Sequence, residues 1–478
     1  MPFHWELEFL EAFYDENGRR AKAGFDAIIG NPPYDVLSER ETGHDLTALR
    51  TFIDHEPVYL PSSTGKNNLF KLFICRSLEL LADGGFFGLI TPMAILGDLT
   101  TAETRKQITR IASFTGIEAF PQKDNPKKRV FREAKLSTAV FIAIKGSGHS
   151  EPFRVRVHPG RDIEAASPSF SLRTEEIGLY DPENYAIVSC AQVDWDLAVR
   201  IMQTGRLRRL ADVATSFQGE VNESNERRDR RISYSSNDGP EVIRGAHLCL
   251  YALREASQGT AVYLLRDRFL DRSTSSEDQK AFHHRYARVG FQRKSPQNNF
   301  RRLIAARIPQ GTFLLESISY VPSHKCSTPL EMVLALLNSK LGDWYFRLGS
   351  TNAMVGEYQF NNLPFPIFRT SSNNAESLAV SSSLRAMHSG DMAGAFASVE
   401  PLLSSAPFSP LLERLFVEAT ERIEAIEEAR EHVRRVDRSA LDPHAQPYQD
   451  FIDRLFYAMA GISDAEARGL EERLARMQ

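Results

Sequence analysis

The chain has 478 residues, of which 42% are hydrophobic and 25% are charged, and its formal net charge is −4. This composition is typical of a globular protein of about two to four domains, and it excludes a largely disordered chain. The slightly acidic total excludes a uniformly basic nucleic-acid binder, and no apolar run approaches the roughly 18 residues of a membrane-spanning helix.

The four cysteines, Cys75, Cys190, Cys249 and Cys326, are far apart in the sequence. Their spacing provides neither a disulfide framework nor a zinc-binding pair. The N-terminal segment MPFHWELEFLE is acidic and aromatic, and it lacks the basic start of a signal peptide. We therefore expect a cytoplasmic protein with reduced cysteines and no bound metal.

Strand and helix patterns alternate over the first part of the chain. Short apolar runs predict strands at residues 25–29, 86–90 and 136–144, whereas amphipathic patterns predict helices at residues 67–83 and 99–113. This alternation is typical of an α/β layer built on a parallel sheet.

The pattern changes after Gly146, where short β-like runs alternate with polar and basic loops. Residues 330–348 form a strong helical pattern, and the last part of the chain is Ser/Ala-rich, then rich in Glu and Arg, and largely helical. We expect a linker with short strands at residues 146–204, a mixed α/β domain at 205–370 and a helical tail at 371–478.

Positive charge is concentrated in one stretch of the second half. Residues 279–315 contain eight Lys and Arg residues and no acidic residue, whereas the C-terminal tail is acidic. A near-neutral total can therefore hide a basic face suited to nucleic acid, although a solvated surface explains each cluster equally well. The His283-His284 pair in this stretch has no carboxylate or cysteine at ligand spacing, so we expect a surface or DNA-contacting pair rather than a metal site.

The first predicted strand is followed by Asn31-Pro32-Pro33-Tyr34. The two prolines fix φ and hold Asn31 out of the helical region, so the Asn31 side chain and the Pro32 carbonyl can point at one spot. Two such oxygens would accept both hydrogens of an amino group. An exocyclic amine on a heteroaromatic ring is a poor nucleophile because its lone pair is delocalised into the ring. Two hydrogen-bond acceptors favour a tetrahedral nitrogen, on which the lone pair is localised again. Tyr34 offers a flat face on which the ring can stack.

A Pro-Pro turn after a strand can also be no more than a turn. Ligands of α/β folds, however, bind at the carboxyl ends of strands, and this tetrapeptide follows a predicted strand directly. We therefore interpret it as a site that alkylates an exocyclic amine.

The segment FDAIIGNPPY, at residues 25–34, resembles motif IV of the gamma-type N6-adenine DNA methyltransferases. Residues 64–73 and 80–96 resemble the two motifs that follow in that family, and VFREAKLSTAV at residues 130–140 resembles a later one. The resemblance therefore covers most of the first 145 residues.

The resemblance implies a role for each matched side chain. Asn31, Pro32, Pro33 and Tyr34 would form the catalytic motif, with Tyr34 stacked on an adenine that is flipped out of the duplex. By the same resemblance Phe131 packs against that base, and Phe73 lines the pocket of S-adenosylmethionine.

The second half resembles the TaqI-like specificity domain, most clearly in ALLNSKLGDWYFRLGSTNAMVGEYQFNNLPFPIF at residues 335–368. Residues 450–465 resemble the closing segment of the type IIG restriction-modification (Eco57I-like) family. Such domains read the major groove of DNA through basic side chains. The resemblance and the acid-free stretch together predict six DNA-binding residues: Arg244, Arg293, Lys294, Arg301, Arg302 and Lys340.

The family places its S-adenosylmethionine motif, a glycine-bearing strand–loop–helix, well upstream of motif IV. Only 30 residues precede Asn31, and they contain no such loop. We therefore expect residues 1–145 to form the C-terminal half of a catalytic domain, with a partial Rossmann-like methyltransferase sheet. A separate N-terminal polypeptide, with methyltransferase or nuclease parts, would complete it.

The sequence thus predicts a component of a site-specific DNA adenine-N6 methyltransferase that acts on double-stranded DNA in a restriction-modification or phage-defence system. Two alternatives stay open. One is a catalytically inactive DNA-binding specificity protein. The other is an enzyme that methylates protein glutamine or ribosomal RNA guanine, because those enzymes share NPPY-like motifs, although they lack a long specificity domain.

Overall fold

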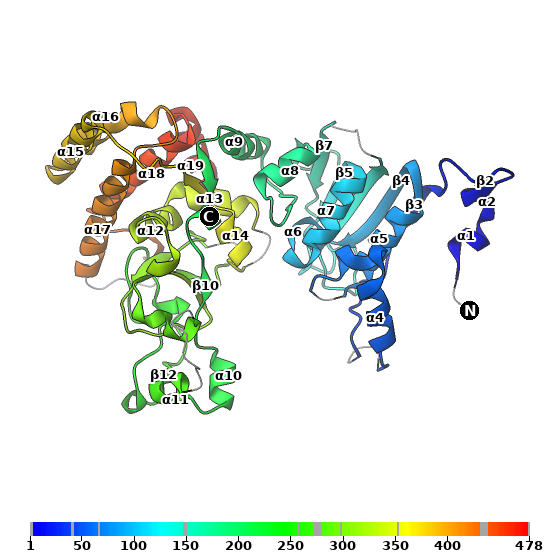
Figure 1. The fold of residues 1–478 in the computed structure, drawn as a ribbon, viewed down its shortest axis with the longest axis horizontal. Coiled ribbons are helices and arrows are strands. Elements are labelled where there is room, and N and C mark those ends of the chain that lie inside the picture. Colours follow the sequence, from blue (N-terminus) through cyan, green and yellow to red (C-terminus); the bar gives the residue numbers. More distant parts are fainter. Residues whose placement is uncertain are drawn as a thin grey trace. The chain divides into compact units, whose positions relative to one another are not determined.

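The computed structural model describes residues 3–39, 43–65, 67–146, 151–256, 258–271, 279–296, 299–350, 353–430 and 438–476. The chain divides into two compact units, Met1–Val199 and Arg200–Gln478, which are described in turn (Figure 1). No helix among the described residues is long and apolar enough to cross a bilayer.

The first unit is built on a six-stranded mixed sheet with the order β3-β4-β6-β5-β7-β8. Its strands are β3 (Phe25–Gly30), β4 (Leu81–Pro92), β5 (Ala112–Phe120), β6 (Thr138–Lys145), β7 (Phe153–Val157) and β8 (Ser169–Leu172). β3 pairs in parallel with β4, and β5 with β7, while the other neighbours are antiparallel. β3 is therefore an edge strand, with β4 as its only neighbour among the described strands.

The mixed α/β class is confirmed, but the expectation of a parallel sheet is wrong for the central pairs. β4 and β5 both run antiparallel to β6. The reason is that the sequence did not predict β5. This strand follows helix α7 (Ala102–Ile111) without an intervening turn residue, so its first residues look like the end of the predicted helix. The predicted strands at residues 25–29, 86–90 and 136–144 are confirmed as parts of β3, β4 and β6.

Helices cover one face of this sheet, where α5 (Leu69–Leu80), α6 (Ala94–Gly97) and α7 lie (Figure 1). Both predicted helices are confirmed, although the second one begins as a 3-10 turn, Leu99–Thr101, before α7. Further helical segments of this unit are α4 (Thr47–His55), a 3-10 turn at Pro57–Ser62 and α8 (Thr174–Tyr180), while α9 (Gln192–Gln203) runs across the boundary after Val199.

The two faces of the sheet differ in their burial. Because side chains alternate along a strand, Phe87 of β4 and Phe141 of β6 point to one face, and both are buried. Phe86 and Ile142 point to the other face and are 50% and 45% exposed. The helical layer therefore covers the face of Phe87 and leaves the face of Phe86 open.

A short segment precedes β3. It contains α1 (Trp5–Glu8), α2 (Leu10–Phe13) and a hairpin of β1 (Tyr14–Asp15) and β2 (Gly18–Arg19). The ring of Phe9 packs edge-on against Phe25 at 5.3 Å between centroids, so the segment is anchored at the start of β3.

The second unit contains an antiparallel sheet with the order β10-β15-β13-β14. These strands are β10 (Phe217–Gln218), β13 (Arg288–Gln292), β14 (Ala305–Ile308) and β15 (Ile318–Pro322). Two small ribbons pair β9 (Leu207–Arg209) with β16 (Pro364–Pro366) and β11 (Ile232–Ser233) with β12 (Tyr263–Leu264).

The helices of this unit are α10 (Glu223–Arg228), α11 (Arg266–Leu270), α12 (Leu330–Asn338), α13 (Lys340–Leu348), α14 (Glu357–Asn361), α15 (Asn374–His388), α16 (Met392–Val399), α17 (Glu413–Ala429), α18 (Gln446–Ala460) and α19 (Asp464–Arg476). The predicted helix at residues 330–348 is divided at Ser339, whose hydroxyl accepts a hydrogen bond from the Gly342 N–H and caps α13. α17 packs against both α12 and α18, so helices of residues 371–478 belong to the core of this unit.

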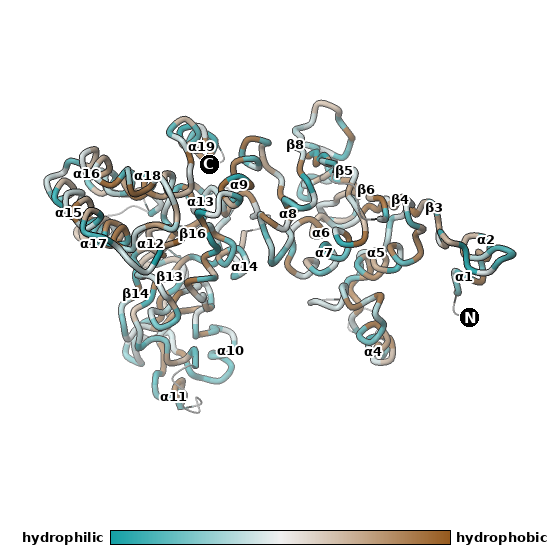
Figure 2. The backbone as a smooth tube through the Cα atoms, turned by 45° about the horizontal axis from the view of Figure 1, so that its top comes forward, coloured by the Kyte–Doolittle hydropathy of each residue, from teal (hydrophilic) through white to brown (hydrophobic). Residues whose placement is uncertain are grey.

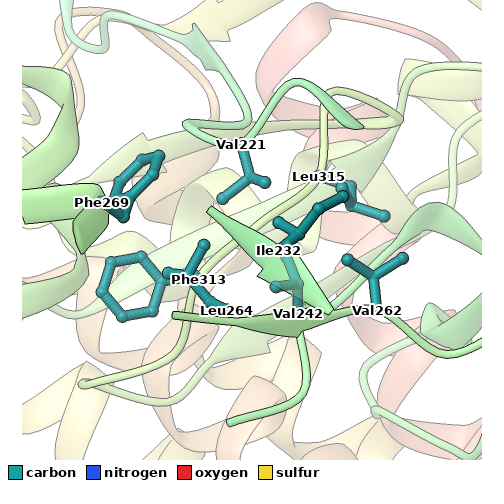
Figure 3. Packing of buried hydrophobic residues seen from close by; sticks show 8 residues of the cluster. All are labelled: Val221, Ile232, Val242, Val262, Leu264, Phe269, Phe313 and Leu315. Carbon is teal, nitrogen blue, oxygen red and sulfur yellow. The ribbon is translucent and has the colours of Figure 1, made fainter. Parts of the chain in front are cut away.

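A separate apolar cluster forms around β11 and β12 (Figure 3). Its buried members are Val221, Ile232, Val242, Val262, Leu264, Phe269, Phe313 and Leu315. The nearby helix α10 is hydrophilic along its length (Figure 2), so this part of the unit combines a small core with a polar surface. The division into functional segments at residues 1–145, 146–204, 205–370 and 371–478 stays a prediction.

Candidate functional site

The tetrapeptide Asn31-Pro32-Pro33-Tyr34 lies directly after the carboxyl end of β3. Pro32 is buried, whereas Asn31 and Pro33 are exposed and Tyr34 is half-buried. Because β3 and β4 run in parallel, their carboxyl ends meet at the same end of the sheet. The Asn31 amide is thus held next to a buried proline and stays accessible to a ligand.

Tyr34 is fixed to the neighbouring strand. Its hydroxyl donates a hydrogen bond of 3.0 Å to the Ile90 carbonyl near the end of β4. Burial raises the pKa of Tyr34 to about 12, so the hydroxyl stays protonated at neutral pH and keeps this bond. The hydrogen bond fixes the ring beside the exposed Asn31.

Phe131 is brought to the same place from a distant part of the chain. Its ring lies 5.9 Å from that of Tyr34, at an interplanar angle of 72°. Two aromatic rings therefore stand together next to Asn31 and Pro32, although about a hundred residues separate them in the sequence. The sequence predicts both residues for one base-binding site, and the geometry is compatible with that role.

The chain after Tyr34 is held by backbone pairing with the start of α5. The Leu37 N–H donates to the Asn67 carbonyl at 2.9 Å, and the Leu69 N–H donates to the Asp35 carbonyl at 3.0 Å. These bonds tie the tetrapeptide to the helix that carries Phe73. Phe73 is 47% exposed, so it is not an ordinary core aromatic and remains available to a ligand.

Sequence reasoning missed Lys71, which lies on α5 and is fully buried. Its ammonium donates to the carbonyls of Thr64 at 2.8 Å and Thr100 at 3.2 Å. Burial lowers the pKa of Lys71 to about 8, because removal from water disfavours the charged form more than the charges of Cys75 and Asp98 favour it. The only signal in the sequence is a lysine on the apolar side of an amphipathic helix.

The described residues fit the acceptor amine better than they fit S-adenosylmethionine. Asn31 and Pro32 offer two oxygens for an amino group, and Phe73 offers an apolar contact. The described residues before β3 form α1, α2 and a hairpin, without a glycine-bearing strand–loop–helix that could hold a ribose and a methionine group. The arrangement at the end of β3 is therefore compatible with the binding of an amino group.

The predicted DNA-binding residues lie in different environments of the second unit. Arg244, Lys294 and Arg301 line one cavity. Lys340 pairs with Glu471 at 2.9 Å, and the buried Arg302 donates to the Ser350 hydroxyl at 2.9 Å. Arg293 also lies in this unit, half-buried, with its guanidinium near the Glu316 carbonyl at 3.4 Å. All six stay predictions as DNA contacts.

Acidic residues from other segments neutralise part of the acid-free stretch. Arg288 pairs with Glu220 at 3.0 Å, with both side chains buried. Arg307 pairs with Glu424 of α17 at 2.9 Å and with Glu331 of α12 at 2.7 Å. The stretch therefore does not form one continuous basic face.

The expectation for His283-His284 is wrong, because both rings are buried. His283 Nδ1 lies 3.0 Å from the Tyr320 hydroxyl, and His284 Nδ1 lies 2.9 Å from the Ala281 carbonyl. Both are core residues with hydrogen-bond partners.

Among the described residues no group of three or more His, Cys, Asp or Glu side chains could hold a metal ion.

The first 125 residues match the family model of the Eco57I restriction-modification methylase. A curated relative from Methanocaldococcus jannaschii, RM.MjaORFECS2P, is a type II restriction enzyme and methyltransferase by name, and it is 30% identical over 108 residues. That match covers 22% of this chain and 7% of the relative. The coarser part of the resemblance, to restriction-modification methylases, is confirmed for this region.

The fold is also similar to that of a solved enzyme, the type IIL restriction-modification enzyme MmeI in complex with DNA. The TM-score is 0.50 at 9% identity, over 94% of this chain and 57% of the enzyme. This chain therefore spans a little over half of the enzyme's length and a small fraction of the curated relative. At this identity the similarity concerns the fold alone.

Proposed function

We propose that the chain is the target-amine and specificity component of a gamma-type DNA adenine-N6 methyltransferase in a restriction-modification or phage-defence system. It would bind double-stranded DNA and methylate a flipped adenine with S-adenosylmethionine as methyl donor. The match of the first 125 residues to the Eco57I methylase family supports this class of enzyme.

The observation that carries the proposal is the arrangement at the end of β3. The Asn31 side chain and the Pro32 carbonyl would accept the two hydrogens of the adenine amino group and favour a tetrahedral nitrogen. Tyr34, fixed by its bond to the Ile90 carbonyl, would stack on the base, and Phe131 would support it. Such stacking offsets part of the few kcal/mol that base flipping costs.

The chain's residues would act before the transfer and during it. They bind and orient the amino group and direct its lone pair away from the ring. The aromatic side chains replace the stacking contacts that the base loses when it leaves the duplex. When bound, S-adenosylmethionine supplies an electrophilic methyl group. No general base is needed to generate the nucleophile, which agrees with the absence of a carboxylate or histidine from the Asn31–Tyr34 tetrapeptide.

We also infer that another polypeptide segment completes the donor side. Two features of the first unit support this. β3 is an edge strand, and Ile29 on it is 92% exposed. Ile29 is paired in register with Gly88, whose neighbour across the sheet is Ile142, so the open apolar face continues from β4 and β6 to this edge.

The test uses the chain co-expressed with the polypeptide of the adjacent upstream reading frame and purified as a 1:1 complex. The complex is incubated with duplex DNA and radiolabelled S-adenosylmethionine, and methyl incorporation into DNA and protein is counted. We expect label in DNA. No label in DNA from a verified complex, or label in protein alone, would contradict the proposal.

A further inference from the structure

A cavity of about 690 Å³ lies wholly within the second unit. This volume is within the roughly 300–1,000 Å³ that is typical of ligand sites. Four of its lining residues are cationic, Arg244, Lys294, Arg301 and Arg438, and they come from three segments of the chain, since Lys294 and Arg301 belong to the same stretch. None of the described residues that line it is acidic.

Three of the cationic side chains, Arg244, Lys294 and Arg438, form no ion pair with a carboxylate among the described residues. Arg438 donates to the carbonyls of Ala246 at 2.6 Å and Glu255 at 2.5 Å, and Arg244 donates to the Thr260 carbonyl. Carbonyl oxygens orient a guanidinium but do not neutralise it. Lys294 is exposed and has no ion pair among the described residues. This is the opposite of Arg288 and Arg307, whose charges are paired with glutamates.

Arg301 differs from the other three. It is buried, it donates to the Ser339 carbonyl at 3.0 Å, and its charge lowers the pKa of the nearby buried Asp453. Burial nevertheless dominates and raises the pKa of Asp453 to about 6, so this carboxyl is mostly ionised at neutral pH and offsets one positive charge, which Lys340 and Arg301 share. The cavity therefore has a net cationic lining.

The remaining lining groups suit the other parts of a nucleotide. Gln292 and Asn299 supply amides, and Ser317 and Ser439 supply hydroxyls. Phe300, also on the lining, is 54% exposed and offers an aromatic surface. Guanidinium and ammonium groups recognise phosphate, amides pair with polar edges of a base, and an aromatic ring can stack on its face.

We propose that this cavity is the seat for one nucleotide of a bound DNA strand, with its phosphate on Arg244, Lys294 and Arg438 and its base against Phe300. The proposal rests on the DNA-binding function proposed above and names the site. It assigns a DNA contact to Arg438, in the segment that the sequence predicts only as a helical tail.

The tail is firmly part of the site. The Leu250 N–H donates to the Arg438 carbonyl at 3.1 Å, so the main chain at Arg438 is bound beside the cavity. Farther along the tail, the Tyr251 hydroxyl donates to Gln449 of α18 at 2.7 Å. Residues 246–255 are therefore held against the tail by hydrogen bonds to the Arg438 guanidinium, to the Arg438 carbonyl and to Gln449.

The test compares the full chain with four single variants: Lys294→Ala, Arg438→Ala, Phe300→Ala and the control Arg385→Ala. Arg385 is on α15, where its guanidinium donates to Ser382, and it does not line the cavity. Affinity for a random-sequence 30-base-pair duplex is measured by fluorescence anisotropy from 50 to 300 mM salt.

We expect the Lys294 and Arg438 variants to bind about tenfold more weakly, since hydrogen bonds to charged groups are strong. Their slopes of log affinity against log salt should each fall in magnitude by about 1. Phe300→Ala should weaken binding with the salt slope unchanged, because stacking releases no counterions. The Arg385 variant should behave like the unmodified chain.

The outcomes separate the two proposals. If the unmodified chain fails to bind the duplex, the proposed DNA function is contradicted. If it binds but the Lys294 variant keeps its affinity and slope, the nucleotide seat is overturned while the function stands. Because Lys294 is exposed and has no ion pair among the described residues, weaker binding by its variant would not reflect unfolding. Micromolar binding of free deoxyadenosine monophosphate, lost in Arg438→Ala, would instead mean a soluble nucleotide site and also overturn the proposal.

Discussion

The two units place their functional groups in opposite ways. In the first unit the four residues of the candidate catalytic motif are contiguous, at the end of one strand, and the hydrogen bond from Tyr34 to the Ile90 carbonyl ties them to the neighbouring strand. In the second unit the cationic cavity takes Arg244, Lys294, Arg301 and Arg438 from three segments that are far apart in the sequence. A contiguous motif is visible in a sequence, whereas a site assembled by tertiary contacts is not.

The comparison also shows that charge in a sequence is a weak guide to charge on a surface. Arg288 and Lys294 belong to the same acid-free stretch, yet the first is buried against Glu220 and the second is exposed without an ion pair among the described residues. Substitutions in each unit can therefore test this difference between the units, because a structural residue should affect stability and a functional residue should affect activity.

The largest effect is expected at the buried pair of Arg288 and Glu220. Arg288→Met leaves an unpaired buried carboxylate, and we expect the free energy of unfolding of the second unit to fall by about 3–5 kcal/mol. Urea unfolding measures it. Adding Glu220→Gln should recover part of the loss, because the unpaired charge is removed. A loss below about 1 kcal/mol in the single variant would contradict a structural role.

The next effect concerns the amine-binding residue of the first unit. Asn31→Ala should lower the rate of DNA methylation by the 1:1 complex about 100- to 1,000-fold, as expected when one preorganised polar contact to the reacting group is lost. Stability should stay unchanged because Asn31 is exposed. The matched control is Asn17→Ala, an exposed asparagine of the β1–β2 hairpin. Equal methylation rates for both variants would contradict the role of Asn31 in binding the amine.

A smaller effect is expected at Tyr34, where ring and hydroxyl have different tasks. Tyr34→Phe removes the bond to the Ile90 carbonyl and should cost about 1 kcal/mol of stability, with the stacking surface kept. Tyr34→Ala removes the ring and should lower methylation at least tenfold further. If the two variants methylate equally slowly, the hydroxyl rather than the ring is essential, and the stacking role is wrong.

A pH dependence of stability is expected from Lys71. Its pKa in the folded chain is about 8, below its ordinary value of 10.5. Between these values the unfolded chain binds more protons, so stability should rise with pH, by at most about 1.4 kcal/mol per pH unit. Urea unfolding of the unmodified chain and of Lys71→Met between pH 7.5 and 9.5 measures this. The difference between them should change with pH, and parallel curves would contradict the burial of an ammonium group.

Much of the first unit could be predicted from the sequence, because its strands and helices are continuous patterns with clear ends. β5 could not, since it follows α7 without a turn residue and its direction depends on pairing with β6. Phe131 was predicted through resemblance to a family motif, whereas the only local sign of the buried Lys71 was its place on the apolar side of an amphipathic helix.

Less of the second unit could be predicted, and the reason is again physical. The role of a basic residue there depends on which carbonyl or carboxylate the fold brings to it. Lys340 pairs with Glu471 across more than a hundred residues, and Arg438 reaches carbonyls near residue 250. His283 likewise has a distant partner, Tyr320 of β15, whereas His284 contacts the Ala281 carbonyl within its own 3-10 turn.

The most direct test of the central claim is the identity and position of the methylated base. The chain and the upstream polypeptide are co-expressed in cells without endogenous DNA methylation, and the genomic DNA is analysed by nucleoside mass spectrometry and modification-sensitive sequencing. The account predicts N6-methyladenine at one recognition sequence, absent when Asn31→Ala replaces the unmodified chain. Methylcytosine, or unmodified DNA from cells that contain the intact complex, would contradict it.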